Sequence, residues 1–260
     1  MKPDIRQAVA RFYDFQPSPF ADQDIPFYLS QLPKSNCRVL ELGCGTGRVL
    51  IPLAGACEYI QGVDISASMI AICQEKLAQQ DIPAQRARAE VGDMTRLDLK
   101  RTFDLIIAPF RAFQNLETDE ELEGFFQTVR QHLSDDGRCI LNVFRPFADE
   151  PTLRKVWAER TADQQRWEHP LGKGRLIGYD RIAGVHPQKL VVYPVLSYRY
   201  YEGEDLKDEA DTHIAMRCYY PDEFEDLIAA HGFQVHRKWG GYSGEGYGEG
   251  TELVIQFALA

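Results

Sequence analysis

The stretch ELGCGTGR, residues 41–48, decides the fold of this 260-residue chain. It follows the apolar run Cys37–Leu42, which predicts a short strand, and it precedes a segment of helical character. Glycines at such a turn let the backbone bend sharply and approach a ligand closely. The stretch therefore predicts an α/β fold of the Rossmann-like type, with a cofactor bound at this turn.

The segments that follow alternate between strand and helix. Three further apolar runs predict strands: Tyr59–Asp64, Phe103–Ala108 and Arg138–Phe144. Thr118 and Glu121 form the pattern of a capping box that opens a helix, and the DDG sequence at residues 135–137 predicts its end. Apolar strands that alternate with helices are typical of a parallel sheet covered on both faces. We expect a mostly parallel sheet of seven strands with helices on both faces.

The pattern changes after about residue 147. Three segments rich in Tyr, Val and Ile predict antiparallel strands: Ile177–Gly184, Leu190–Tyr201 and Thr212–Tyr219. Turn sequences at residues 186–189 (HPQK) and 202–211 (EGEDLKDEAD) separate them, and a short helix is expected around Leu153–Trp157. Pro221 then opens a last helix, which Gly232 closes. A final hairpin is expected from Phe233–Trp239 and Glu252–Leu259.

These boundaries divide the chain into three parts. Residues 1–146 form the predicted cofactor-binding domain. Residues 147–217 form an antiparallel β insertion, which we expect to act as a substrate cap. Residues 218–260 return to complete the first domain. The exposed strand edges of the insertion also make a homodimer possible.

Composition narrows the classes of partner. The formal net charge is −10 and basic residues do not cluster, which argues against a nucleic-acid partner. The six cysteines form no CxxC pair, and the six histidines show no metal-ligand spacing. No stretch reaches the roughly 18 apolar residues of a membrane span, and the N-terminal sequence does not have the pattern of a signal peptide. We expect a soluble, cytoplasmic protein without a metal site or membrane contact, acting on a small molecule.

Two cofactors fit a glycine-rich turn of this kind. A dinucleotide would need GxGxxG and a phosphate site at the helix N-terminus, whereas here GxGxG is followed by Arg48. Glu41, two positions before the first glycine, suits a cofactor that carries positive charge instead of phosphate. Asp64, which ends the next strand, would accept hydrogen bonds from ribose hydroxyls in either case.

The sequence ELGCGTGR resembles the first motif of class I methyltransferases that depend on S-adenosylmethionine (SAM), and the resemblance extends through most of the first 145 residues. Gly92-Asp93-Met94 matches a further motif of that family. The resemblance implies that Gly43 and Gly45 pass under SAM, that Glu41 holds the loop, and that Asp93 and Met94 meet the adenine. The full implied cofactor set is Tyr13, Glu41, Gly43, Cys44, Gly45, Asp64, Ile65, Met69, Asp93, Met94 and Pro109.

The segment APFRAFQN, residues 108–115, bears on the methyl acceptor. Relatives that methylate nucleic-acid bases carry (D/N)PP(Y/F) here, and Ala108 replaces the leading residue, which disfavours that activity. Arg111 would bind an acidic group of the acceptor or form an ion pair with carboxylates of the sheet itself. Aromatic residues of the insertion would line a substrate pocket or serve packing. The candidate acceptor-binding residues are Phe110, Arg111, Phe113, Tyr198, Tyr200 and Arg217.

The resemblance implies a methyltransferase that moves the methyl group of SAM to nitrogen or oxygen of a small molecule and leaves S-adenosylhomocysteine (SAH). No catalytic base can be identified from spacing. The alternatives are a protein methyltransferase, a SAM-binding protein without catalysis and, with least support, an NAD(P)-dependent oxidoreductase.

Overall fold

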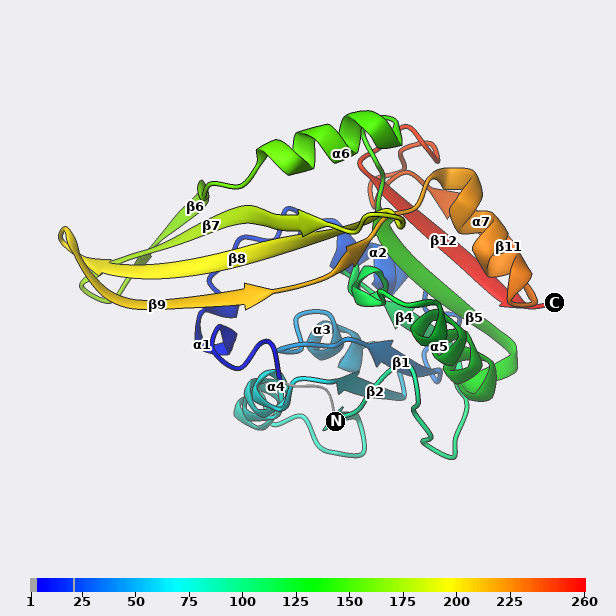
Figure 1. Ribbon diagram of the computed structural model, residues 1–260. Helices are drawn as coiled ribbons and strands as arrows, with labels where there is room; N and C mark the ends of the chain where they lie inside the picture. Colours follow the sequence, from blue (N-terminus) through cyan, green and yellow to red (C-terminus); the bar gives the residue numbers. More distant parts are fainter. Residues whose placement is uncertain (1–3, 21) are drawn as a thin grey trace.

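The computed structural model describes residues 4–20 and 22–260, which form an α/β protein with two sheets (Figure 1). The larger sheet has seven strands in the order β11-β12-β5-β4-β1-β2-β3. Strands β1 to β5 are parallel to one another, and β12 is antiparallel to both β5 and β11. The bounds are Arg38–Leu42 (β1), Tyr59–Asp64 (β2), Ala87–Val91 (β3), Phe103–Ala108 (β4), Leu133–Phe144 (β5), Phe233–Trp239 (β11) and Glu252–Leu259 (β12). The predicted seven-stranded, mostly parallel sheet is confirmed.

Helices cover both faces of this sheet. Their bounds are Asp24–Ser30 (α2), Leu50–Ala54 (α3), Ala67–Gln79 (α4), Asp119–His132 (α5) and Pro221–Ala230 (α7). On one face, α2, α3 and α4 pack onto Val39, Leu105 and Ile107. On the other, α5 and α7 pack onto Leu40 and Ile106. Successive side chains of a strand point to opposite faces, so these apolar runs supply both layers of the core.

Helix α5 begins as the sequence predicted but ends differently. The Thr118 side chain accepts from the Glu121 backbone N–H at 3.2 Å, and the Glu121 carboxylate accepts from the Thr118 N–H at 3.0 Å. The expected turn at residues 135–137 is wrong, because β5 starts at Leu133, directly after the helix. Those residues lie where the register between β4 and β5 shifts, so the DDG sequence forms an irregularity inside the strand.

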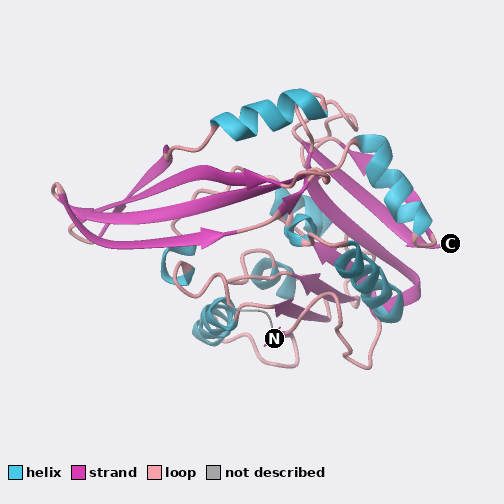
Figure 2. Cartoon of the chain, viewed as in Figure 1, coloured by secondary structure: helices cyan, strands magenta, loops and turns pink. Residues whose placement is uncertain are grey.

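The second sheet is antiparallel and projects from the first as a curved arm (Figure 2). Its strands run in the order β10-β8-β7-β6, with β9 also paired to β8. The bounds are Gln164–Leu171 (β6), Gly174–Val185 (β7), Val191–Glu202 (β8), Asp205–His213 (β9) and Met216–Arg217 (β10). Together with helix α6 (Glu150–Glu159), these strands occupy the predicted insertion. The domain limits themselves and the homodimer stay predictions.

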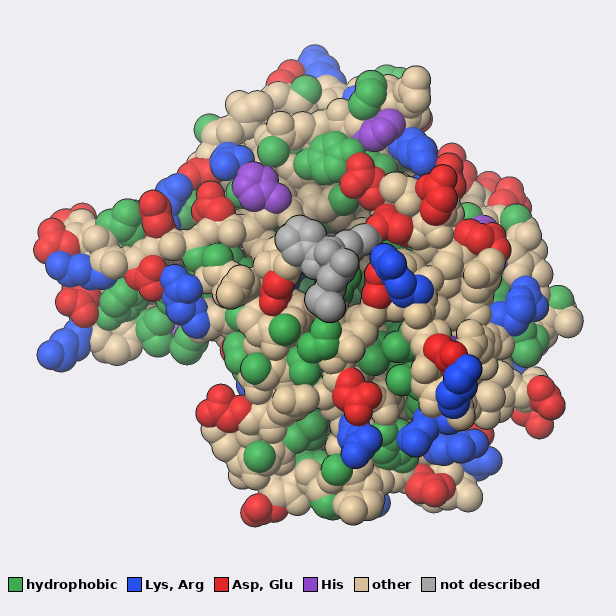
Figure 3. Space-filling view, turned by 60° about the horizontal axis from the view of Figure 1, so that its bottom comes forward, with side chains coloured by type: hydrophobic (Ala, Val, Ile, Leu, Met, Phe, Trp, Pro, Cys, Tyr) green, Lys and Arg blue, Asp and Glu red, His purple; other side chains and the backbone are tan. Residues whose placement is uncertain are grey.

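Three features of this arm were not predicted correctly. The segment Thr212–Tyr219 was expected to be one strand, but β9 ends at His213 and β10 comprises only Met216–Arg217. Residues 202–211 were expected to form a turn, but the chain reverses at Gly203 (φ +63°) and Asp205–His213 is a strand. Strand β6 was not expected at all. Both strands are rich in charged or polar side chains and largely exposed. Figure 3 shows acidic and basic side chains mixed on the projecting end of the arm. Solvent-facing outer strands carry too few apolar residues for a sequence pattern to indicate them.

Two helical segments pack on the arm. Helix α6 packs Leu153 and Trp157 against Ile182 and Val192. The N-terminal segment, with the short helix α1 (Ala10–Tyr13), packs Phe12 against Tyr198, on the same face of β8 as Val192 but toward the far end of the arm. Within residues 4–20 and 22–260, no helix is long and apolar enough to cross a membrane.

Phe113, on the short 3₁₀ helix η1 (Ala112–Asn115), provides a test of the core. It is fully buried, with the rings of Phe125, Tyr219 and Phe224 centred 4.9 to 5.8 Å away. We expect Phe113→Ala to lower the free energy of unfolding by about 3–5 kcal/mol, because the cavity left in this aromatic cluster cannot collapse fully. Urea denaturation measures the change. Leu206→Ala, at an exposed position on the arm, is the control; a loss no larger than that of the control would contradict the assignment.

Candidate active site

A cavity of about 760 Å³ lies between the carboxyl edge of the parallel sheet and the arm. Its volume is within the range of about 300–1,000 Å³ usual for small-molecule sites. One side is formed by the loops after β1, β2, β3 and β4, and the other by α6 and the inner strands of the arm. Crevices at the carboxyl ends of parallel strands are where ligands bind in such sheets.

The glycine-rich turn forms one wall of this cavity. Gly43 (φ +78°) and Gly45 (φ +53°) both have the left-handed backbone that favours glycine. A Cβ atom on Gly43 would stand 2.7 Å from the Cβ of Ala112, so the turn packs tightly against η1. At Gly45 no atom lies within 4 Å of such a Cβ. The backbone of Gly45 thus faces open space that a ligand can fill.

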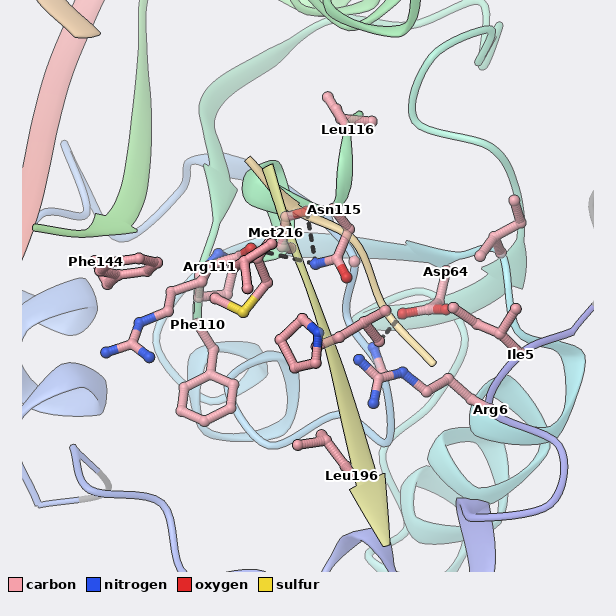
Figure 4. Close-up of a pocket in the computed structure, with 18 of the residues that line it drawn as sticks. Ile5, Arg6, Asp64, Phe110, Arg111, Asn115, Leu116, Phe144, Leu196 and Met216 are labelled. Atoms are coloured by element: carbon pink, nitrogen blue, oxygen red, sulfur yellow. Dashed lines mark hydrogen bonds between the residues drawn. The ribbon is translucent and has the colours of Figure 1, made fainter. Parts of the chain in front are cut away.

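Asp64 connects this turn to the end of β2. Its Oδ2 accepts from the Gly45 N–H and its Oδ1 from the Ser66 N–H, both at 2.9 Å. Burial raises the pKa of Asp64, while the two backbone donors and the guanidinium of Arg6 act in the opposite direction. The carboxylate lies at the cavity wall, and Arg6 is on the same side (Figure 4).

Asp93 follows β3 and is held by local contacts. Its Oδ1 accepts from the N–H and the hydroxyl of Thr95 at 2.9 and 2.7 Å, and its Oδ2 accepts from Arg96 at 3.0 Å. Burial acts to raise its pKa, but the hydrogen bonds from Thr95 and Arg96 prevail and lower it. Asp93 is therefore an ionised carboxylate at the cavity wall at neutral pH.

Nine of the eleven residues predicted for cofactor binding line the cavity, and the exceptions are Glu41 and Cys44. Cys44 is buried and its Sγ packs against Gly62 of β2, so its side chain belongs to the core. Glu41 lies in β1 beneath the turn and is 1% exposed. Its Oε2 is buried and has no hydrogen-bond partner among the residues that the structure describes. Burial raises the pKa of Glu41 well above its usual value.

Of the six predicted acceptor-binding residues, Phe110 and Arg111 line the cavity. Both have positive φ, +51° and +65°, which is uncommon for residues other than glycine. The Arg111 guanidinium forms an ion pair with the fully buried carboxylate of Glu252 through Nη2 and Nε. The structure thus supports the ion pair with a carboxylate of the sheet, rather than a free guanidinium for the acceptor.

The other four lie away from the cavity, which corrects the prediction. Phe113 is in the core, and Arg217 pairs with Asp119 at 2.7 Å. Tyr198 and Tyr200 do share one face of β8, as expected. They lie beyond the cavity, where the N-terminal segment covers that face; Tyr198 stacks on Phe12 with ring centroids 6.2 Å apart.

Residues earlier in the same row of β8 line the cavity instead: Val192, Pro194 and Leu196. The two-residue period of a strand could have indicated this row, but not which part of it would stay uncovered. Asn115, Arg145 and Arg160 also line the cavity and were missed. Trp157 lines it as well, and it is one of the insertion's aromatic residues that were expected to line a pocket or serve packing.

Comparison with known proteins decides the family. Residues 39–137 match a family model described as a methyltransferase domain. A putative methyltransferase of Bacillus subtilis, YqeM, is 25% identical over 235 residues, which is 90% of this chain and 88% of that protein. The protein is a SAM-dependent methyltransferase, and residues 39–137 are its methyltransferase domain.

Solved structures share the fold of this methyltransferase along nearly its whole length. The CcbJ methyltransferase of Streptomyces caelestis has a TM-score of 0.77 at 20% identity and covers 99% of this chain and 98% of its own. SAM-bound CalS10, an amino pentose methyltransferase from Micromonospora echinaspora, has a TM-score of 0.69 at 18% identity and covers 96% of both chains.

The cofactor is SAM, and the NAD(P)-dependent alternative is set aside. The residues around the glycine turn fit a cofactor that has no phosphate there, because the carboxylates of Asp64 and Asp93 lie at the wall. The open space at Gly45 is where a bulky group can approach the backbone.

Asp64 offers a test of this arrangement. In Asp64→Asn the amide nitrogen would face one of the two N–H donors, from Gly45 or Ser66, and the negative charge would be lost. We expect the Kd for SAH, measured by calorimetry, to rise at least about tenfold, which is about 1.4 kcal/mol. Glu90→Gln, on the neighbouring strand β3 and exposed, is the control. An unchanged Kd in folded Asp64→Asn would contradict this role.

The raised pKa of Glu41 predicts that the stability of the protein depends on pH. Because its folded-state pKa is raised, the folded protein holds a proton that the unfolded chain releases above about pH 4.3. The stability of the wild type relative to Glu41→Gln should therefore fall as the pH rises above that value, by at most about 1.4 kcal/mol per pH unit. Urea unfolding of both proteins without SAM at pH 5 and pH 8 measures this. An equal difference at both pH values would refute the prediction.

Proposed function

We propose that this enzyme transfers the methyl group of SAM to a nitrogen or oxygen atom of a small molecule held between the cofactor and the arm. The observation that carries the proposal is a continuous cavity. It runs from Gly45 and Asp64 on the cofactor side to Trp157, Ile182 and Val192 on the arm. A volume of about 760 Å³ accommodates a cofactor together with a small acceptor.

In this proposal the cofactor occupies the wall formed by the parallel sheet. Asp64 accepts hydrogen bonds from the ribose hydroxyls, and Asp93 and Met94 meet the adenine, with Ile65 and Met69 beside it. The methionine end lies toward Tyr13 and Pro109. When bound there, SAM supplies an electrophilic methyl group on a sulfonium. The remaining catalysis is alignment of the acceptor, which can supply a large part of the rate.

Asn115 is suited to align the acceptor atom. Its Nδ2 donates to the carbonyl oxygens of Arg111 and Ala112 at 3.3 and 3.2 Å. Since carbonyls only accept, the amide nitrogen must face them, which leaves Oδ1 directed into the cavity (Figure 4). An oxygen fixed in this way accepts an N–H or O–H of the acceptor and orients its lone pair.

The side chains available as a general base favour methylation of a nitrogen atom over methylation of an oxygen atom. Among the described residues that line the arm side of the cavity, Asp180 is the one carboxylate, and no histidine lines it. Asp180 is already engaged by Arg160 at 2.6 Å and Arg166 at 2.8 Å. A neutral amine needs no base before it attacks, whereas a hydroxyl does. CalS10, which shares the fold, is itself an amino pentose methyltransferase.

Transfer of labelled methyl from SAM tests the proposal. The enzyme is incubated with matched amines and alcohols, such as benzylamine with benzyl alcohol and cyclohexylamine with cyclohexanol. A parallel reaction contains a peptide mixture. Label in the small-molecule fraction, most strongly with the amines, supports the proposal. Label in peptides alone would indicate a protein methyltransferase, and no label despite bound SAM would indicate a protein without catalysis.

Asn115→Ala should reduce kcat/KM for the best amine of this panel by about 10- to 100-fold, because the hydrogen bond that orients the nitrogen is lost. The Kd for SAH should stay within about twofold of the wild type. Gln127→Ala, which removes an exposed amide on α5, is the matched control. Equal kcat/KM in Asn115→Ala and wild type would remove Asn115 from the mechanism.

A further inference from the structure

Arg145 is a cation of the cavity wall without a carboxylate partner among the described residues. It follows directly after β5, at the carboxyl edge of the sheet. Its N–H donates to the Thr251 carbonyl at 2.9 Å, and its Nε donates to the Gly250 carbonyl at 2.6 Å. The first bond fixes the backbone of Arg145, and the second holds the guanidinium by its Nε edge. The two Nη atoms are left to donate to a ligand.

The neighbouring arginines, in contrast, are neutralised by carboxylates. Arg111 is paired with Glu252, and Arg160 is paired with Asp180, which Arg166 also contacts. The carboxylates on this side of the cavity are thus already shared among other guanidiniums. The charge of Arg145 is left for something that enters the cavity.

The cavity wall that includes Arg145 also carries large apolar side chains. Phe144 and Phe147 flank it in sequence, and Trp157, Ile182 and Met216 complete the wall. Phe147 is 63% exposed, although large apolar side chains of this protein are mostly buried. These side chains favour an acceptor with an apolar body.

We propose that Arg145 binds a carboxylate of the methyl acceptor, so that the substrate is an amphipathic acid. Its apolar body would lie on the wall around Trp157, and its nucleophile would point to Asn115. A carboxylate matches the charge of one unpaired guanidinium and the fork of its two Nη atoms. This inference rests on the proposed function, because it assumes a small acceptor in the cavity.

Three para-substituted benzylamines test the proposal: the carboxylate, the neutral carboxamide and the phosphonate. Binding of each to the SAH-loaded enzyme is measured by calorimetry, and methyl transfer is measured by mass spectrometry. We expect the carboxylate to bind at least about tenfold more tightly than the carboxamide. Arg145→Gln should abolish this preference without changing the Kd for SAH, and Arg145→Lys should keep part of it. Arg237→Gln, an exposed arginine of β11 outside the cavity, is the matched control.

The outcomes separate this inference from the proposed function. Equal binding of acid and amide, no binding of the acid, or a preference that survives in Arg145→Gln would overturn the inference. A preference for the phosphonate over the carboxylate would also overturn it. Methylation of the carboxamide as fast as the acid would support the proposed function while refuting the role of Arg145. Arg145-dependent binding of the acid, with no methyl transfer to any small molecule, would support the anion site and refute the proposed function.

Discussion

The hydrogen bond between the Gly45 N–H and the Asp64 carboxylate is the interaction on which the rest of the site depends. It links the turn after β1 to the end of β2, and both glycines of that turn have a left-handed backbone. A side chain at either glycine would strain the backbone, and at Gly43 it would also collide with Ala112. The bond thus fixes a bare stretch of backbone at the carboxyl edge of the sheet, which is where a large cofactor can come close.

The arm completes the site by closing the space above that edge. Its inner row on β8 provides an apolar wall at Val192, Pro194 and Leu196, and the N-terminal segment covers the continuation of the row at Tyr198. In the proposed function, the length of the uncovered part limits the size of the acceptor. The packing also decides which arginines of the cavity wall are neutralised. Glu252 from β12 forms an ion pair with Arg111, whereas Arg145 has no carboxylate partner among the described residues.

Local sequence patterns predicted an element correctly where the residues of that element alone determine its structure. The capping box at Thr118, the apolar runs of β1, β2 and β4, and the helix that Pro221 opens need no distant partner to be recognised. Strands β6 and β9 were missed because they lie on the outside of the arm and are largely exposed, so their stability depends on pairing with β7 and β8 and not on an apolar pattern. Phe113 was misplaced because an aromatic residue next to a site looks the same in sequence whether it faces the cavity or the core.

The sequence by itself determined the parallel sheet, the cofactor turn and the carboxylates around it, since glycine conformation, strand periodicity and spacing are properties of neighbouring residues. Only the tertiary structure decided which side chains line the cavity. Arg111 and Glu252 are 141 positions apart, and Phe12 reaches Tyr198 from the opposite end of the chain. Whether an arginine is neutralised or an aromatic ring is covered depends on such long-range contacts, and no local pattern encodes them.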